Sequence, residues 1–431
     1  MQAAIKNGVG DIIAELKSRE LISQLAGGDE LKSHLAGGSR TLYCGFDPTA
    51  ESLHIGNMVP LLALKRFQMA GHRPIALVGG ATGMIGDPSF KDSERQLNSA
   101  DVVSAWVERL KPQLSQFLNF DEGNNAALLV NNLDWTENYD VLSFLRDIGK
   151  HFSVNAMIQK ESVKQRLVRE GEGISFTEFS YMILQSYDFA ELNKRYGCTL
   201  QIGGSDQWGN ITGGIDLTRR MNQQQVYGAT CPLITKADGS KFGKSEAGTV
   251  WMDASKTSPY AFYQFWLNTA DADVYRFLKF FTFLSLDEIE QIEQIDLASN
   301  TRPEAQAVLA RAVTELVHGA DGVSAATRIS QALFSGEIAA LNEQDLQQLE
   351  LDGLPCTEFD GGSQGIVDVL VRTELAKSNK MAREFIANNA VSVNGQLLNS
   401  PEFQLSSQNA LIGRFFVVKR GKKLFHLVKL A

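Results

Sequence analysis

The residues best suited to chemistry begin in the stretch 41–58, TLYCGFDPTAESLHIGNM, where a strand-like run is followed by a turn and a helix start. Pro48 fixes its own φ and keeps Asp47 out of the helical region, so the turn is stiff. The helix start offers free backbone N–H groups and a partial positive charge, which suit an anion such as a phosphate. Gly56 would let a flat or phosphorylated ligand approach, and His54 could donate a hydrogen bond to it. Taken alone, these residues also fit an ordinary helix start with a packed histidine.

A glycine-rich segment, GGATGMIGDP at 79–88, follows an apolar run that suits a strand. Its spacing is G-x-x-G-x-x-G rather than the G-x-G-x-x-G of a dinucleotide fingerprint, and Asp87-Pro88 interrupts any helix after the last glycine. We interpret the segment as a loop of close approach that carries the Asp87 carboxylate. A wide turn is the alternative interpretation.

A second segment, GSKFGKS at 239–245, is a near miss to a phosphate loop, because three residues separate its glycines where four are required. The SEAGTVWMD that follows Lys244 does not suit a helix. We interpret the segment as a loop whose two lysines can follow a phosphate as its charge grows during a reaction. A solvated basic turn explains the same pair of lysines.

The segment 203–207, GGSDQ, lies between an apolar run and a helical pattern. Its glycines would admit a ligand, and the Asp206 carboxylate could accept hydrogen bonds from ribose hydroxyls. Capping of the following helix by Ser205 or Asp206 explains these residues equally well.

The helical stretch ISFTEFSYMILQSYDFAEL carries a polar stripe, because Tyr181, Gln185 and Asp188 are spaced by four and three residues. These residues lie within roughly 60° of arc at about 100° per residue. By periodicity alone the stripe is the solvent face of the helix. Its phenol, amide and carboxylate are nevertheless what a small zwitterion with a hydroxyl would need.

The pattern of apolar runs predicts an α/β fold with a mostly parallel sheet and helices on both faces, reaching to about residue 235. Strands are expected at 41–44, 73–79, 126–130, 200–203 and 226–234, and helices near 93–117, 141–149, 177–192 and 206–220. An amphipathic helix and a glycine-punctuated lead-in precede them in residues 1–40.

Beyond that sheet the pattern changes twice. Residues 258–341 are helical and rich in aromatic side chains, and the acidic, then glycine-rich stretch after them suits a linker. Helices at 366–375 and 378–388 follow, with an Asn394-Gly395 hairpin signal. The expected domains are 1–235 (catalytic), 236–344 (lysine loop and helical domain), 345–362 (linker) and 363–431 (small α+β domain).

Composition narrows the class of protein. The chain has 431 residues, 44% of them hydrophobic and 21% charged, and lacks an apolar run of membrane-spanning length. Four scattered cysteines without a Cys-x-x-Cys, and no evident export signal, predict a cytoplasmic protein without a disulfide framework or zinc site. The formal charge is −9, but it is unevenly distributed. The chain from residue 363 onward has ten basic and four acidic residues, which gives a net charge of +6 there and −15 in the rest of the chain. This contrast indicates a nucleic-acid module on an acidic body.

Taken in order, these segments resemble one family. HIGN at 54–57 resembles the HIGH signature of class I aminoacyl-tRNA synthetases, and KFGKS at 241–245 resembles their KMSKS signature. YCGFDPTAESLHIGN, GGATGMIGDPS, FTEFSYMILQSYDF and QIGGSDQWGNIT together are similar to bacterial tyrosyl-tRNA synthetases, over essentially the whole chain. The segment VRTELAKSNKMAREFIANNAVSVNG resembles the small RNA-binding domain that the family shares with a ribosomal small-subunit protein.

The resemblance implies a Rossmann-like catalytic domain, a helical anticodon-side domain and a small RNA-binding domain, in a homodimer that binds tRNA(Tyr). It also implies a two-step reaction. The carboxylate of L-tyrosine attacks the α-phosphorus of ATP and pyrophosphate leaves; the terminal ribose hydroxyl of the tRNA then takes the tyrosyl group. Mg²⁺ is expected to accompany ATP, although no dedicated carboxylate cluster for it is evident in the sequence.

The resemblance also implies a role for particular residues. The reacting γ-phosphate would be held by Thr49 and His54, and the leaving pyrophosphate by Lys91, Arg95, Lys241, Lys244 and Ser245. Tyrosine would be bound through its ammonium by Asp87, Tyr181 and Gln185, through its phenol by Tyr43 and Asp188, and near its carboxylate by Gln207. The ATP site would be lined by Gly45, Asp47, Gly56, Asn57, Gly204 and Asp206, together with Lys244, and RNA would be bound by Arg372, Lys377, Lys380 and Arg383.

One position departs from the signature, because Asn57 replaces its second histidine. An amide can still donate a hydrogen bond to a ring oxygen or a phosphate, so we expect little loss. Two alternatives stay open at this point. Tryptophanyl synthetases share the architecture, although Tyr43 with Asp188 favours a phenol over an indole. An RNA-binding protein on an enzyme-like scaffold is the other, and its basic residues could equally form a solvated helix face.

Overall fold

The structure is a computed structural model that describes residues 11–89, 97–121, 123–160, 163–164, 167, 173–239, 242–245, 248–299, 303–360 and 362–431. The chain forms two compact units, one of residues 1–243 and 275–295, the other of residues 244–274 and 296–431. None of the helices in these ranges combines the length and the apolar character that a membrane span requires.

The first unit is built on a six-stranded sheet in the order β1-β6-β5-β2-β3-β4. Five strands are parallel, namely β2 (Thr41–Phe46), β3 (Arg73–Val78), β4 (Leu128–Asn131), β5 (Cys198–Gly204) and β6 (Tyr227–Cys231). These confirm the five strands expected from the apolar runs. The antiparallel edge strand β1 (Gln24–Ala26) was not foreseen, since three residues carry too little pattern.

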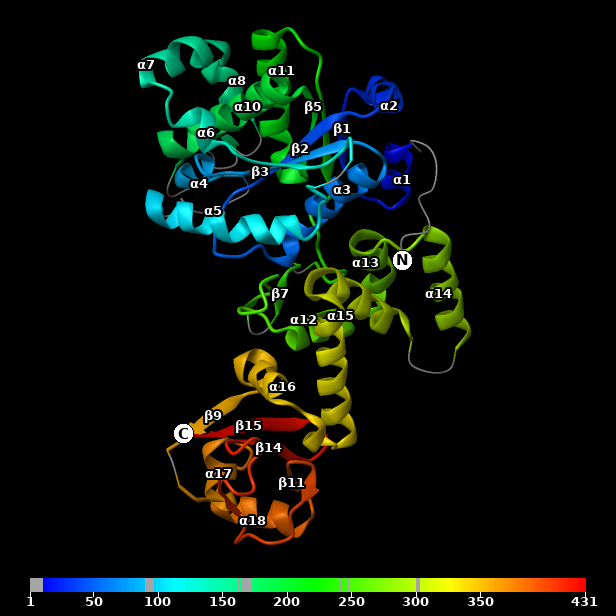
Figure 1. Cartoon of the computed structure of the whole chain (residues 1–431), viewed down its shortest axis with the longest axis vertical. Coiled ribbons are helices and arrows are strands. Elements are labelled where there is room, and N and C mark those ends of the chain that lie inside the picture. The colour runs from blue at the N-terminus through cyan, green and yellow to red at the C-terminus, as the bar shows by residue number, and fades with distance from the viewer. Residues whose placement is uncertain are drawn as a thin grey trace. The chain divides into compact units, whose positions relative to one another are not determined.

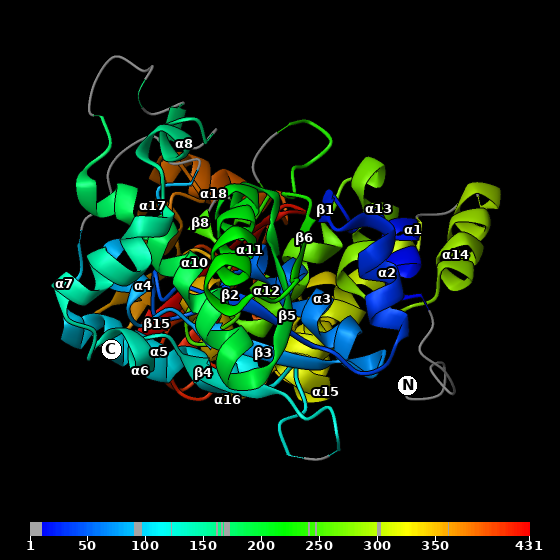
Figure 2. The same ribbon diagram turned by 90° about the horizontal axis from the view of Figure 1, so that it is seen from above.

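Helices cover both faces of this sheet, as the sequence predicted (Figures 1 and 2). Because crossovers between parallel strands are right-handed, α3 (Met58–Met69) and α5 (Ala100–Ser115) pack on one face, and α10 (Phe176–Tyr196) and α11 (Trp208–Asn222) on the other. The remaining helices of the unit are α1 (Ile12–Ser18), α2 (Gly28–Ala36), α4 (Thr82–Ile85), α6 (Leu133–Thr136), α7 (Val141–Ser143) and α8 (Val154–Ile158), with short turns η1 (Ile55–Asn57), η2 (Phe144–Ile148), η3 (Gly149–His151) and η4 (Ser205–Gln207).

The longest helix of this unit, α10, has clear start and stop signals. The Ser175 side chain accepts a hydrogen bond from the backbone N–H of Glu178, 3.2 Å away, and so caps the first turn. Gly197 ends the helix in the left-handed region with φ 64°, a conformation that costs glycine little. On the α11 side, an added Cβ at Gly213 would meet the Ser186 hydroxyl at 2.8 Å, so α10 and α11 approach closely there.

The second unit begins with the β7–β8 hairpin (Lys244–Ser245 and Gly248–Thr249) and continues into helices. These are α12 (Pro259–Leu267), α15 (Ala305–Ser335), η5 (Ile338–Ala340), α16 (Glu343–Gln348) and η6 (Leu349–Gly353). Helix α15 is interrupted at Gly319, whose φ of 70° and ψ of −179° are accessible only to glycine. Helices α13 (Asp271–Phe281) and α14 (Leu286–Ala298) each contribute residues to both units.

The C-terminal part of this unit is a five-stranded sheet in the order β12-β11-β14-β15-β9. Its strands are β9 (Cys356–Phe359), β11 (Val391–Val393), β12 (Gln396–Leu397), β14 (Phe415–Arg420) and β15 (Leu424–Leu430), accompanied by α17 (Ile366–Arg372), α18 (Asn379–Ala387) and the β10–β13 pair (Gln364–Gly365 and Gln404–Leu405). Asn394 and Gly395 have φ of 49° and 84°, so they form the expected β11–β12 hairpin turn.

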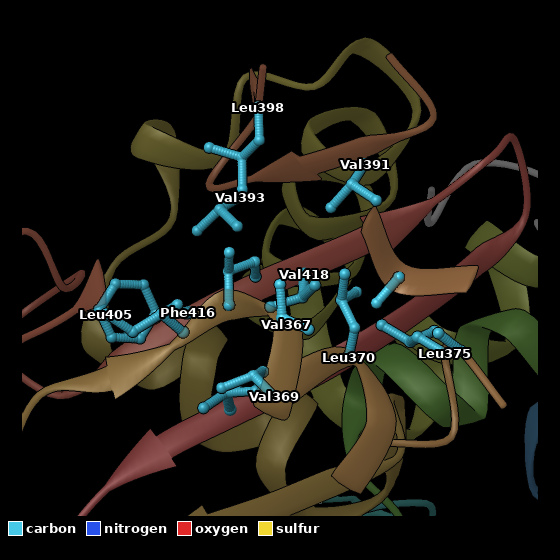
Figure 3. Close-up of a cluster of buried hydrophobic side chains, with 14 of the residues drawn as sticks. Val367, Val369, Leu370, Leu375, Val391, Val393, Leu398, Leu405, Phe416 and Val418 are labelled. Atoms are coloured by element: carbon cyan, nitrogen blue, oxygen red, sulfur yellow. The ribbon is translucent and has the colours of Figure 1, made fainter. Parts of the chain in front are cut away.

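Alternate residues of β14 serve two different cores. Phe416 and Val418 pack with Val369 and Leu370 of α17 in the cluster of Figure 3. Their neighbours on β14 point the other way, where Val417 packs with residues of α15, α16 and η6. The sheet is therefore buried on both faces, and one face joins the helices of its own unit.

The expectation of a linker at 345–362 is wrong in structural terms. Strand β9 lies inside this range and pairs in parallel with β15, while Leu346 and Leu349 are fully buried. The sequence did not reveal β9 because it is a short edge strand among acidic residues, and its first three side chains are partly or fully exposed. The other domain boundaries stay predictions.

Candidate active site

The site lies where the strand order of the sheet reverses. The chain leaves β2 toward β3 and β4, but leaves its neighbour β5 in the opposite direction toward β6. In open α/β sheets a crevice forms outside the carboxyl ends of the strands at this point. The turn 47–57 follows β2, and η4 follows β5, so the sequence's two candidate segments meet at one edge.

At the buried end of this crevice lie Tyr43 and Asp188, 1% and 3% exposed. Among the described residues the Tyr43 hydroxyl has no hydrogen-bond partner, and its ring packs edge-on against Phe189 with centroids 5.3 Å apart. Burial raises the pKa of the Tyr43 phenol, and the nearby charge of Asp188 raises it further. A phenol hydroxyl without a partner beside a buried carboxylate is an arrangement suited to a hydroxyl-bearing ligand.

Two side chains that the sequence analysis missed hold the Asp188 carboxylate. Trp135 Nε1 donates to its Oδ1 at 2.8 Å, and Asn132 Nδ2 donates to its Oδ2 at 3.0 Å. Burial raises the pKa of the Asp188 carboxyl to about 7, and these two hydrogen bonds oppose the rise. Asn132 and Trp135 follow β4 directly, so their place after an expected strand was the signal that could have found them.

Asn132 also ties this carboxylate to the glycine loop. Its Oδ1 accepts from the backbone N–H of Ala81 at 2.7 Å, and its Nδ2 also donates to Thr82 Oγ1 at 3.0 Å. Thr82 in turn donates to Asp47 Oδ1 at 2.7 Å. A single chain of hydrogen bonds thus links the ends of β2, β3 and β4.

The expected ammonium-binding residues form two bonded pairs. Tyr181 donates its hydroxyl proton to Asp47 Oδ2 at 2.6 Å, and Gln207 Nε2 donates to Asp87 Oδ2 at 2.7 Å. The Oε1 of Gln185 is buried and has no hydrogen-bond partner within the part of the chain that the structure describes. Tyr181 and Asp47 were assigned to different ligands by the sequence analysis, yet they contact each other.

Gln201 is a further residue that the sequence analysis missed. It lies beside Tyr43 on the neighbouring strand, is 2% exposed, and its Oε1 has no hydrogen-bond partner in the described ranges. It lies inside an otherwise apolar strand, and its alternation along β5 was the available signal.

The polar stripe of α10 does not face solvent, so the prediction from periodicity alone was wrong. Tyr181 and Asp188 are buried, and the opposite side of the helix is buried too, because Met182 and Phe189 belong to core clusters. A helix packed on both sides has no solvent face, and its polar residues instead serve the interior of the unit.

Glycines near the site are required by close approach. An added Cβ at Gly79 would meet Asp47 Oδ1 at 2.0 Å, and one at Gly83 would meet Pro48 Cγ at 2.8 Å. The loop after β3 therefore packs directly on the stiff turn after β2. At Gly204, an added Cβ would meet the Oδ1 of Asp206 at 2.4 Å.

His54 and Asn57 form a reciprocal cap at the start of η1. His54 Nδ1 accepts from the backbone N–H of Gly56 at 3.0 Å, and Asn57 Oδ1 accepts from the His54 N–H at 3.1 Å. Because Nδ1 is an acceptor, a neutral ring carries its proton on Nε2, which becomes the donor. An added Cβ at Gly56 would meet the His54 ring at 2.7 Å, so glycine is required here by the histidine itself.

Thr49, Gly45 and Gly56 are exposed at this edge of the sheet, where a phosphate could reach them. The backbone N–H of Thr49 donates to the Asp47 carbonyl at 2.9 Å, which keeps the turn compact. An ideal Cβ built on Gly243 lies 3.6 Å from Ile55 Cγ1 and 3.9 Å from the Gly56 nitrogen, so the second signature segment touches the first.

Several expected residues cannot be placed with the others. Lys91, Arg95 and Lys241 lie outside the described residues, and for Lys244 and Ser245 only the backbone is described, as β7. In the C-terminal domain Arg372, Lys377, Lys380 and Arg383 are exposed on or near α17 and α18, and the Arg372 guanidinium lies 3.9 Å from the Phe359 ring centroid.

Comparison with known proteins agrees with this geometry. The family model "tRNA synthetases class I (W and Y)" matches residues 36–335, and the model of the SYY-like C-terminal domain of tyrosine–tRNA ligases matches residues 345–428. The tyrosine–tRNA ligase of Aliivibrio fischeri (strain MJ11) is 64% identical over 97% of this chain and 98% of its own length. The tyrosine–tRNA ligase of Escherichia coli (strain 55989 / EAEC) is 59% identical over 97% of this chain and 98% of its own length.

The chain belongs to the tyrosine–tRNA ligase family of class I tRNA synthetases. Among solved structures, the C-terminally truncated mitochondrial tyrosyl-tRNA synthetase of Aspergillus nidulans is similar with a TM-score of 0.68 and 31% identity, over 75% of this chain and 94% of that one. A tryptophanyl-tRNA synthetase from Encephalitozoon cuniculi shares the fold at a TM-score of 0.52 and 13% identity, over 78% and 90%. The synthetase fold alone therefore does not select the amino acid; side chains in the crevice must do so.

The raised pKa of Asp188 makes the stability of the ligand-free synthetase depend on pH. The folded carboxyl titrates near 7, whereas an unfolded one titrates near about 4. Between these values the folded state keeps a proton that the unfolded state has lost, so this stabilisation is present at low pH and disappears as pH rises through 7. Relative to Asp188→Asn, we expect the wild-type free energy of unfolding to fall by about 3 kcal/mol between pH 5 and pH 8, because the loss is about 1.4 kcal/mol per pH unit up to the folded pKa.

Urea unfolding of both proteins at the two pH values measures this change. Using the difference between them removes the contribution of every other titrating group. A difference that stays constant across the range contradicts a raised pKa at Asp188.

Proposed function

We propose that this chain is a tyrosyl-tRNA synthetase that activates L-tyrosine with ATP and transfers it to the 3′ end of its cognate tRNA in the cytoplasm. The observation that carries the proposal is the buried pair formed by the unpartnered Tyr43 hydroxyl and the Asp188 carboxylate at the switch point of the sheet. In this proposal the Tyr43–Asp188 pair selects the amino acid, and the rest of the crevice would bind the nucleotide.

In the first step a tyrosine carboxylate oxygen forms a bond to the α-phosphorus of ATP, and the bond from that phosphorus to the bridging oxygen breaks, releasing pyrophosphate. In the second step the tRNA ribose hydroxyl forms an ester with the tyrosyl carbonyl carbon, and AMP leaves. The protein forms no covalent bond in either step. It contributes positioning and charge stabilisation, which suffice for such transfers.

The phenol end explains selectivity for tyrosine. The substrate hydroxyl can donate to the Asp188 carboxylate and accept from the Tyr43 hydroxyl, whose partner is otherwise missing. Phenylalanine lacks this oxygen and would leave both buried groups without it, which costs free energy. Trp135 and Asn132 act as positioning residues, because they aim the carboxylate without contacting substrate.

The amino end would lie among Asp87, Tyr181 and Gln185. A carboxylate accepts several hydrogen bonds, so Asp87 can keep its bond from Gln207 and still accept from an ammonium. The buried, unpartnered Oε1 of Gln185 supplies a second acceptor. Asp47 holds Tyr181 in place through its 2.6 Å hydrogen bond.

The nucleotide would occupy the exposed edge of the sheet. Nε2 of His54 would donate to a phosphate oxygen, and Thr49 lies on the same turn. Gly45, Gly56 and Gly204 leave room for the rest of the nucleotide beside Asp206. Lysines 241 and 244 and Ser245, with Lys91 and Arg95, would meet the growing charge of the leaving pyrophosphate. Mg²⁺ would enter with ATP as part of the substrate.

Amino-acid-dependent exchange of labelled pyrophosphate into ATP tests the proposal. We expect exchange with tyrosine and little with phenylalanine or tryptophan. Asp188→Ala should reduce kcat/KM for tyrosine by at least about 100-fold, because a hydrogen bond to a charged partner is worth about 1.5–3 kcal/mol and the hydroxyl loses its orientation.

Phe334→Ala is the control, because Phe334 is exposed and belongs to the other unit. Unchanged tyrosine exchange in Asp188→Ala would refute the assignment. Stronger exchange with tryptophan would favour a tryptophanyl enzyme, and tRNA binding without any exchange would favour a non-catalytic RNA-binding protein.

The C-terminal domain would bind the tRNA through its exposed cations. Lys380 and Arg383 lie one turn apart on α18. The Arg420 guanidinium lies near the same helix, 5.0 Å from the ring centroid of Phe385.

We expect the double change Lys380→Ala, Arg383→Ala to weaken tRNA binding and to reduce the slope of log K against log salt by about 2. The charge-preserving swap Lys380→Arg, Arg383→Lys should retain the slope, as filter binding over a salt series would show. Equal slopes in all three proteins would argue for a solvated face.

A homodimer is supported by an apolar surface within residues 141–176. Its large side chains, Val141, Leu142, Leu145, Val154 and Phe176, are all more than half exposed. Several exposed apolar side chains within one stretch of the chain favour a protein partner, and a second copy of the chain would provide one by symmetry. We expect Leu142→Asp to shift the sedimenting species from dimer to monomer at micromolar concentration. Phe334→Asp, at an equally exposed site in the other unit, should remain dimeric. A wild-type monomer would contradict the proposal.

A further inference from the structure

The described part of the lysine loop is held by aromatic packing. Phe242, the first of the two residues between Lys241 and Lys244, stacks on Phe281 with ring centroids 5.3 Å apart and meets Phe277 edge-on at 5.0 Å. Both partners lie on the last turns of α13, and their own centroids are 5.7 Å apart. The three rings form what we call the aromatic anchor. Such pairs add about 0.5–1.5 kcal/mol each beyond their burial.

The same helix also holds the chain that leads into the loop. Arg276 donates from a terminal guanidinium nitrogen to the Thr235 carbonyl at 2.6 Å. Helix α13 thus contacts the segment near its start, through Thr235, and near its end, through Phe242. After Phe242, the chain reaches the first signature, because Gly243 lies against Ile55 and the Gly56 nitrogen.

A buried arginine fixes the end of α13. Arg66, on α3 and only 3% exposed, donates to the backbone carbonyls of Lys279, Phe280 and Thr282 at 3.3, 3.4 and 2.6 Å. Arg19 on α1 donates to the Lys279 and Leu284 carbonyls at 3.4 and 2.8 Å. The Lys279 and Phe280 carbonyls belong to the last turn of α13, at the negative end of its dipole, and those of Thr282 and Leu284 follow the helix directly.

The location of this arginine is unusual for a core group. A buried guanidinium loses its hydration, and burial lowers the pKa of Arg66 to about 9. Fixed acceptors offset part of that loss, so moving the carbonyls at the end of α13 away from Arg66 would cost free energy. Arg66 lies on α3, the helix that begins directly after the His54–Asn57 cap. The arginine therefore couples the helix of the first signature to the helix that anchors the second.

We propose that the aromatic anchor positions the two lysines of the loop for pyrophosphate release, and that Arg66 is the positioning residue that sets where the anchor lies. This inference rests on the proposed function. Lys241 and Lys244 are one and two residues from Phe242, and consecutive Cα atoms are about 3.8 Å apart. The position of Phe242 therefore limits how far the chain can carry either lysine from the anchor.

The proposal separates two steps of the reaction. Lysine placement matters while charge develops on the leaving pyrophosphate, which occurs only in tyrosine activation. Pyrophosphate has left before the tyrosyl group moves to tRNA, so transfer does not need the anchor. Tyrosine binding does not need it either, because the phenol pair lies on β2 and α10. A residue that merely stabilised the fold would affect all three measurements together.

The experiment uses the full-length protein with Phe242→Ala, Phe281→Leu, Phe280→Leu and the double variant Phe242→Ala, Phe281→Leu. Phe280 is the matched control, because it is buried on the same helix but its ring does not contact Phe242 among the described contacts. Pre-steady-state formation of tyrosyl-adenylate, equilibrium binding of tyrosine, and single-turnover transfer from isolated enzyme–adenylate complex to tRNA are measured for each protein.

We expect Phe242→Ala to slow adenylate formation about tenfold at saturating substrates, with tyrosine affinity and the transfer rate within twofold of wild type. Phe281→Leu should slow the same step, and the double variant should be no slower than Phe242→Ala, because both changes break one contact. Phe280→Leu should keep the wild-type rate. Arg66→Met should repeat the selective loss, and Arg66→Lys should restore part of it.

Four outcomes overturn the proposal. They are adenylate formation within twofold of wild type in Phe242→Ala, an equal loss in the transfer step, multiplicative losses in the double variant, or an equal loss in Phe280→Leu. If Arg66→Met does not fold, the Phe242 and Phe281 variants still decide. A wild-type protein without tyrosine-dependent adenylate formation would instead refute the proposed function, so the two failures are distinguishable.

Discussion

A desolvated carboxylate organises the catalytic unit. Burial alone would protonate Asp188 at neutral pH, and the hydrogen bonds from Trp135 and Asn132 oppose this. The need to supply those donors dictates where β4 ends and how α6 begins, since both donors follow that strand. It also places α10 against the sheet, with the carboxylate turned toward Tyr43. A pocket built in this way is rigid, because loosening any donor leaves a charge buried without compensation.

The second constraint is the close approach of backbones around Asp47. This carboxylate accepts from both Thr82 and Tyr181, so the loop after β3 and the helix α10 must each reach the turn after β2. Gly79 and Gly83 permit that approach, since any side chain there would collide with Asp47 or Pro48. The hydrogen bonds to Asp47 and the absent Cβ atoms are two aspects of the same packing. They bring the ends of three parallel strands to one crevice.

The sequence was informative where a physical rule is local. The five parallel strands were predictable because strands buried on both faces are continuous apolar runs. The hairpin at Asn394-Gly395 was predictable because few residue types adopt a positive φ. The orientation of the polar stripe on α10 was not predictable, because periodicity separates the two faces of a helix but does not show which face is buried. Asn132 and Trp135 were missed for a related reason. Their hydrogen-bond acceptor, Asp188, lies more than fifty residues later in the chain on another element, and local sequence patterns do not show such a contact.

The division of labour in the crevice follows from electrostatics. A group that must distinguish one hydroxyl has to be dry, because water would replace a missing partner, and the phenol end is accordingly buried within the sheet. Groups that meet a highly charged pyrophosphate must release it into water, so they suit the exposed edge where Gly45, Thr49 and Gly56 lie. Side chains on strands and long helices are fixed by the core, whereas a loop needs an anchor of its own. Phe242 supplies such an anchor by stacking on Phe281 of α13, and Arg66 holds the end of that helix through its hydrogen bond to the Thr282 carbonyl.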